Sequence, residues 1–140
     1  MAKPISAERL RTLQLQNRVF QFATCVVGHC PHTVPHLAAR EIWSHLVAAA
    51  VSTSNNLEEA DEASSDADFV AKMKIALREV KEARRCMKFV MVCRLANGEL
   101  LSDLEDEARQ LAAIFATIII NTKRRLERER AARKPPARNL

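Results

Sequence analysis

Cysteine and histidine side chains are concentrated in one short segment of the sequence, and these residue types could support metal or thiol chemistry. They occur in the order Cys25, His29, Cys30, His32 and His36. Thiolates and imidazoles are the usual ligands of zinc, and four of them can close a tetrahedral site. The spacing is irregular, however, and lacks the Cys-x2-Cys pair typical of zinc sites. A thiol at a helix end and histidines in a surface loop explain the same residues, so we predict no metal and leave metal binding by this segment open.

Thiol catalysis would need more than a cysteine. A nucleophilic thiol requires a neighbouring base and a third group that orients the base. The segment offers histidines but no third group at a fixed spacing. Cys86 and Cys93 stand seven residues apart within a predicted helix, where we expect them to pack as small apolar residues. We therefore predict that the chain is not an enzyme and has no cofactor.

The sign of the charge reverses sharply in the middle of the chain. Six carboxylates and no cation lie between Glu58 and Asp68, whereas eight cations and two carboxylates lie between Lys72 and Arg94. Acidic residues favour the positive N-terminal end of a helix, so capping of a helix that begins near Asp68 explains part of this pattern. A divalent cation bound by the carboxylates is the alternative, although the chain has no Glu-x-x-His pair of the kind found in di-iron bundles.

Two groups of basic residues could bind phosphate. The first lies on one predicted helix and the second near the C-terminus; together they comprise Lys81, Arg84, Arg85, Lys88, Arg124, Arg125, Arg128 and Arg130. The segment from Lys123 to Leu140 has eight cations against two carboxylates, while the formal charge of the whole chain is only +5. A basic end on a nearly neutral body suggests a polyanionic partner, with nucleic acid favoured over a membrane. A solvated helix face whose charge serves only solubility is the alternative.

The elements that would position these residues are helices. Aromatic residues make up only 4% of the chain, tyrosine is absent, and no proline lies between residues 36 and 134. Apolar residues at spacings of three and four, with Gly-Pro and Asn-Gly punctuation, predict four helices. We expect one from Ser6 to Val27, one from Pro35 or His36 that ends at Asn55-Asn56 or continues to Glu62, one over 68–96, and one from Ser102 towards Pro135.

Each predicted helix has an apolar stripe. The third has an unbroken 4-3 seam, which is typical of a helix with one buried face. The first has a weaker stripe through Leu10, Leu13, Asn17, Phe20, Thr24 and Val27, and Phe22, Ala23 and Val26 widen it on one flank. The fourth opens with Ser102-Asp103-Leu104-Glu105, a capping-box pattern in which Ser102 caps the helix.

Four helices of similar length with short connections predict an antiparallel up-down four-helix bundle over residues 1–134, followed by a disordered Pro/Arg tail over residues 135–140. The fourth helix is apolar on more sides than a single bundle interior requires. A helix that is apolar nearly all round is buried nearly all round. We therefore predict an oligomer whose interface contains Ile114, Ile118, Ile119 and Ile120.

Two further features of the sequence, its hydrophobic segments and its cysteines, predict the cellular location of the protein. The first 25 residues carry arginines through the helical pattern and do not form a secretory signal, and the apolar run from Leu111 to Ile120 is too short to span a bilayer. Four cysteines without dense spacing fit free thiols in a reducing compartment. We predict a cytoplasmic protein with no membrane partner.

The central block resembles a known family. Asn56-Leu57-Glu58-Glu59-Ala60, Ser64, Asp68-Phe69, Lys72, Ile75-Ala76, Glu79 and Glu82 match the bacterial four-helix-bundle family named for proteins encoded in 23S rRNA intervening sequences. The resemblance covers residues 13–126. The chain departs from the family pattern at Arg85-Cys86-Met87, where members usually have an aromatic-rich patch, and in its arginine-rich end after Leu126.

The resemblance implies an all-α bundle that assembles as a homopentameric ring and has no known catalytic activity. One branch of the family serves as the accessory protein of diversity-generating retroelements, where it partners a reverse transcriptase and its template RNA. We therefore predict a non-catalytic, oligomeric protein whose basic surfaces bind RNA or DNA, with a reverse transcriptase as a candidate partner. The alternative is a structural scaffold that recognises another protein and does not bind nucleic acid.

Overall fold

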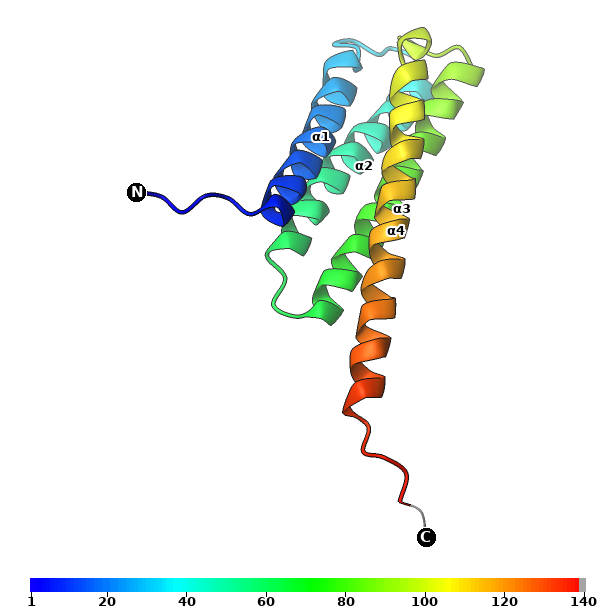
Figure 1. The fold of residues 1–140 in the computed structure, drawn as a ribbon. Coiled ribbons are helices and arrows are strands. Elements are labelled where there is room, and N and C mark those ends of the chain that lie inside the picture. The colour runs from blue at the N-terminus through cyan, green and yellow to red at the C-terminus, as the bar shows by residue number, and fades with distance from the viewer. Residues whose placement is uncertain (139–140) are drawn as a thin grey trace.

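The computed structural model describes residues 1–138 and places four long helices in one bundle (Figure 1). Within these residues the chain has no β-strand, so the predicted all-α class is confirmed. The helices are α1 (Ala7–His29), α2 (Leu37–Asp61), α3 (Asp66–Val92) and α4 (Ser102–Arg133), with a short 3-10 turn, η1 (Gly98–Leu100), before α4.

The core lies along the faces where the four helices meet. Its largest fully buried side chains include Trp43, Leu46, Met73 and Phe115. The most extensive packing is between α2 and α3, followed by that between α3 and α4, whereas α1 packs mainly on α2 and touches α4 only slightly. The indole nitrogen of Trp43 donates a hydrogen bond of 2.8 Å to the carbonyl oxygen of Ala96, which ties the start of α2 to the loop after α3.

The apolar seam predicted for α3 is correct. Six of its seven members are buried, and the seventh, Phe69, is half-buried. The predicted C-terminal end was too late, because α3 ends at Val92 and not at Ala96. Arg94 and Asn97 adopt positive φ angles of 52° and 60°, which takes the chain out of the helix before Gly98. A Cβ atom on Gly98 would lie 2.6 Å from the carbonyl oxygen of Val90, so this turn requires glycine.

The apolar stripe predicted for α1 faces the wrong way. The residues of α1 that enter the core are Val19, Phe22, Ala23 and Val26, whereas Phe20, Thr24 and Val27 of the predicted stripe are exposed. The helix has two adjacent apolar faces, and α2 and α4 cover the one that includes Phe22 and Val26. The other remains on the surface of the protomer.

Several helix ends also differ from the prediction. Helix α1 continues through Gly28 to His29, because Pro31 restricts only the residue directly before it. His36 caps α2, whose open C-terminal boundary falls at Asp61. The capping box at Ser102 does not form: Leu101 occupies the cap position without a side-chain hydrogen bond, and Glu105 reaches towards α3 instead.

Helix α4 is the longest element and extends beyond the other three (Figure 1). It ends at Arg133, immediately before Pro135. Residues 135–138 have no regular secondary structure, and residues 139–140 of the predicted tail lie outside the described part of the chain. None of the helices described is long and apolar enough to cross a membrane.

Candidate nucleic-acid interface

The exposed side of α3 carries a line of cations. Lys74, Arg78, Lys81, Arg85 and Lys88 follow one another at spacings of 4-3-4-3, and all five are exposed. Residues at these spacings share one face of a helix, so the cations form a single stripe of about 21 Å at 1.5 Å per residue. We call these five residues the α3 stripe. Its formation follows from the buried seam, because fixing the apolar face of α3 in the core turns this face outwards.

Arg84 does not belong to the α3 stripe, although its spacing to Lys81 and Lys88 predicts that it does. Its Nε atom lies 2.7 Å from Oε1 of Glu105, which neutralises it on the side that faces α4. Lys88 makes only a long contact of 3.9 Å with the same carboxylate. The α3 stripe also contains two residues that the sequence analysis missed, Lys74 and Arg78. Their signal was present in the sequence, because they continue the spacing of Lys81 and Arg85 towards the N-terminus of the helix.

The second group of cations lies on the C-terminal end of α4, which passes the start of α3 and then projects from the bundle (Figure 1). We call residues 123–133 the overhang; they carry six cations against Glu127 and Glu129. Every side chain of the overhang except Leu126 is exposed. Arg125 is bound, at 3.0 Å to Asp66 at the start of α3 and at 3.0 Å to Glu129, and these hydrogen bonds raise its pKa. Arg124, Arg128 and Arg130 make no ion pair within residues 1–138.

A lysine pair joins the two groups. Lys74 of the α3 stripe lies against Lys123, the first residue of the overhang, and their contact lowers the pKa of Lys74. The main cause is the hydrogen-bonding position of the Lys123 side chain, which favours an uncharged amine at Lys74, and the repulsion between like charges adds to it. When both amines are protonated they repel each other, and an anion that approaches both relieves this repulsion. The α3 stripe and the overhang are thus neighbouring parts of one cationic surface.

The predicted cysteine and histidine cluster is placed differently from a metal site. Nδ1 of His29 lies 2.6 Å from the carbonyl oxygen of Cys25, and Nδ1 of His36 accepts a hydrogen bond from the backbone of Ala39 as the cap of α2. Cys25 and His32 are exposed, and Cys30 is half-buried. Within residues 1–138 no group of three or more His, Cys, Asp or Glu side chains is positioned to hold a metal ion.

The acidic residues around the α2–α3 connection make ion pairs and caps. Asp61 accepts from Nη1 of Arg9 on α1 at 2.6 Å, and Glu59 contacts Nζ of Lys72 at 3.0 Å. Ser65 caps α3, with its hydroxyl accepting from the backbone of Asp68 at 3.0 Å. These contacts favour helix capping together with pairing to basic neighbours as the explanation of the acidic segment.

The four isoleucines predicted at an oligomer interface do not form one surface. Ile119 lies in the core of the protomer, with 6% of its surface exposed. Ile114 and Ile118 are half-buried and line a shallow depression on α4. Ile120 is exposed but lies two residues from Ile118, so it points to a different side of the helix. Ile119 therefore stabilises the protomer, and an interface role stays a prediction for the other three.

The fold and the site define a class of protein: an all-α bundle with a cationic surface along α3 and the projecting end of α4. The chain belongs to the family of 23S rRNA-intervening sequence proteins, whose family model it matches over residues 11–117. The match ends before the overhang, so the overhang lies outside the part that the family shares here. Neither the comparison with curated proteins nor that with solved structures finds a match.

Proposed function

We propose that this protein is a non-catalytic, cytoplasmic nucleic-acid-associated protein that binds the phosphate backbone of RNA or DNA. The observation that carries the proposal is the cationic surface formed by the α3 stripe and the overhang, in which Lys74 and Lys123 are held against each other. Phosphate contacts made by lysine and arginine provide affinity that depends on salt and little on sequence.

The shape of the overhang also supports binding to a backbone. It is a single helix that is exposed around most of its circumference, so it can approach a duplex or a structured RNA without a clash from the bundle. The chain has one tryptophan and no tyrosine, and Trp43 is buried in the core. The chain therefore offers no exposed tryptophan or tyrosine on which bases could stack, which favours recognition of the nucleic-acid backbone over recognition of bases.

We further propose that the protomers assemble as a homopentameric ring, as the family resemblance implies. Within each protomer we propose the antiparallel up-down order. The contact of Arg9 near the start of α1 with Asp61 at the end of α2 supports it, as does the contact of Asp66 at the start of α3 with Arg125 late in α4. Assembly would repeat the cationic surface and increase the avidity for a long polyanion.

The experiment is a salt titration of binding with a structured RNA and a duplex DNA as probes. The purified chain is measured by fluorescence anisotropy, and its mass is determined by light scattering in the same buffers. Binding that weakens linearly in log–log form as salt increases supports the proposal. Absence of binding at low salt refutes it and leaves the alternative, a scaffold that recognises another protein through its apolar surfaces.

A reverse transcriptase is the protein partner that we propose, on the basis of the family resemblance alone. Co-purification of the two tagged proteins, with and without nuclease, tests this partner separately. A complex that survives nuclease treatment indicates direct protein contact. If the complex disappears, the two proteins share only a nucleic acid, and the partner proposal is wrong.

A further inference from the structure

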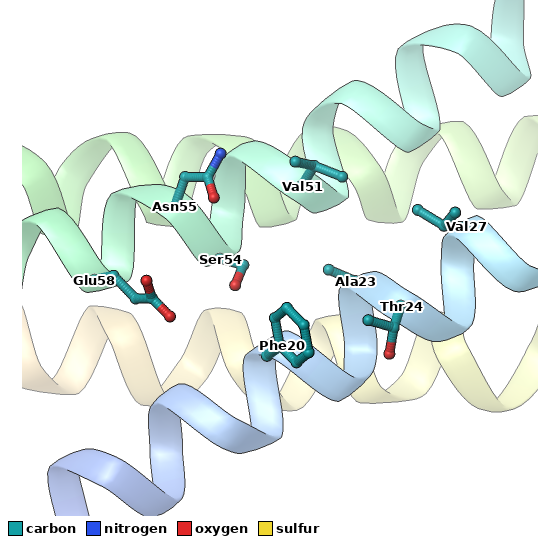
Figure 2. A pocket seen from close by; sticks show the side chains of 8 residues that line it. All are labelled: Phe20, Ala23, Thr24, Val27, Val51, Ser54, Asn55 and Glu58. Carbon is teal, nitrogen blue, oxygen red and sulfur yellow. The ribbon is translucent and has the colours of Figure 1, made fainter.

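A groove runs between α1 and α2 on the surface of the bundle. It has a volume of about 240 Å³ and is lined by Phe20, Ala23, Thr24 and Val27 from α1 and by Val51, Ser54, Asn55 and Glu58 from α2. Figure 2 shows the two sets of side chains facing each other across it, with Glu58 at one end. Small side chains form its floor, because Ala23 and Ser54 are buried where the two helices approach.

The groove is the apolar face of α1 that the protomer does not cover. Phe20 keeps 54% of its surface exposed, and Val27 keeps 46%. Phe20, Thr24 and Val27 are spaced four and three residues apart, the spacing of a helix face that packs against another helix. Their exposure in the protomer therefore indicates a face that is covered by something else.

A second exposed apolar surface lies on α3. Phe89 and Val92, which we call the knob, are 58% and 81% exposed. They lie at the C-terminal end of the α3 stripe and form a shallow apolar depression with the stems of Arg85 and Lys88. The knob lies about 22 to 27 Å along the helix from Lys74, at the end of α3 opposite the overhang.

The charges of the two surfaces are opposite. Glu58 at the groove makes no ion pair within residues 1–138, and neither does Arg85 beside the knob; Lys88 has only its long contact with Glu105. A knob with two cations at its edge thus fits a groove with a carboxylate at its edge. Opposite charges at the rim of an apolar contact select the partner and its register.

We propose that the groove of one protomer receives the knob of a second copy of this chain. The knob comes from α3, and the groove comes from α1 and α2, so each copy can offer its knob while its own groove is occupied. Such a heterologous, head-to-tail contact produces a ring when its rotation closes. The inference rests on the assembly part of the proposed function and identifies the surfaces that would make it. It also assigns Arg85 and Lys88 to the contact between copies and leaves Lys74, Arg78, Lys81 and the overhang to the polyanion.

The test uses two variants with the same chemical change on the two sides of the contact. The knob variant carries Phe89→Gln and Val92→Gln, and the groove variant carries Phe20→Gln and Val51→Gln. The control carries Ile5→Gln and Leu37→Gln, two exposed apolar residues outside both surfaces. All the altered side chains are exposed, so the variants keep their core, which circular dichroism verifies.

The mass of each sample by sedimentation velocity decides the question. We expect the wild type and the control to assemble and each of the two variants alone to be monomeric. An equimolar mixture of the two variants retains one intact pairing, from the knob of the groove variant to the groove of the knob variant. It should therefore give a heterodimer and nothing larger, whereas the wild type should assemble beyond a dimer, which an isologous contact would not allow.

A charge exchange provides an independent readout. Glu58→Lys and Lys88→Glu should each weaken assembly, and the double variant should restore it. Variants that keep the mass of the wild type overturn the inference, as does a mixture that forms no heterodimer. A monomeric wild type overturns both the inference and the proposed assembly. A wild type that assembles through these surfaces but binds no polyanion would refute the proposed nucleic-acid binding and leave the inference standing.

Discussion

Removing three cations from the overhang should reduce the salt dependence of nucleic-acid binding by a predictable amount. The change is Arg124→Gln, Arg128→Gln and Arg130→Gln. These arginines are exposed and make no ion pair in residues 1–138, so their charges are available to phosphate. Arg125 is left unchanged because Asp66 and Glu129 already bind it.

The magnitude follows from counterion release. Each phosphate neutralised contributes about 0.9 to the slope of log affinity against log salt for duplex DNA, so losing three contacts should reduce the slope by about 2.7. Between 50 and 200 mM salt, the affinity of the wild type should then fall by roughly 40-fold more than that of the variant. At a single salt concentration the two proteins would differ by less, so the slope is the quantity to compare.

The assay is the anisotropy titration of a duplex probe, with a control of equal charge. Arg11→Gln, Arg40→Gln and Arg109→Gln remove the same formal charge from exposed positions on α1, α2 and the part of α4 inside the bundle. We expect this control to retain nearly the whole slope. Equal slopes for the two triple variants would refute the reasoning, because binding would then follow net charge and not the overhang.

Three further predictions concern the protomer. Gly28→Ala should increase the free energy of unfolding in urea by about 0.5 to 1 kcal/mol, because Gly28 is helical and nothing lies within 4 Å of an added Cβ. Gly98→Ala should decrease it by about 1 to 3 kcal/mol, because the added Cβ presses on the backbone of Val90. The opposite order of the two effects would contradict the ends of α1 and α3. Lys123→Gln should raise the pKa of Lys74 measured by NMR, because the contact that lowers this pKa is lost. An unchanged pKa in this variant would show that the two lysines do not meet. In the wild type, a bound polyanion should also raise the pKa of Lys74. Burial raises the pKa of the Cys86 thiol, and Glu82 adds to the effect. At pH 8 this thiol should therefore react with a thiol reagent more slowly than the two exposed cysteines, and its reaction should accelerate as the pH rises. Reaction of all cysteines at one rate would contradict the half-buried position of Cys86.

The sequence predicts a helix correctly where that helix has only one apolar face. The seam of α3 is unbroken from Phe69 to Val90, and the opposite face carries charges, so only one orientation buries it well. Helix α1 has apolar residues on two adjacent faces, and periodicity alone does not identify which one meets the core. The capping box predicted at the start of α4 was wrong for another reason. Glu105 fits a capping box by its spacing, but in the structure its carboxylate accepts a hydrogen bond from Arg84 on α3.

The same distinction applies to the candidate site. Lys81, Arg85 and Lys88 could be placed on one face of α3 from their spacing, and extending the pattern would have added Lys74 and Arg78. The contact of Lys74 with Lys123 was not predictable, because these residues are far apart in the sequence and meet only when α3 packs against α4. Local periodicity thus defines each surface, and tertiary packing decides which surfaces adjoin.

A wrong orientation for α1 is itself informative about assembly. The stripe through Phe20 and Val27 has the spacing of a buried face, and the protomer leaves it exposed. Apolar helix faces of this kind are stabilised by burial, and this is the reason that we propose burial of the exposed face against a second copy of the chain. The knob on α3 is the same case, since Phe89 and Val92 extend a helix whose core face is already complete. A head-to-tail assembly requires two exposed apolar surfaces on one chain, and here the groove has a carboxylate at its edge and the knob has cations at its edge. A scaffold for an unrelated protein would need only one such surface.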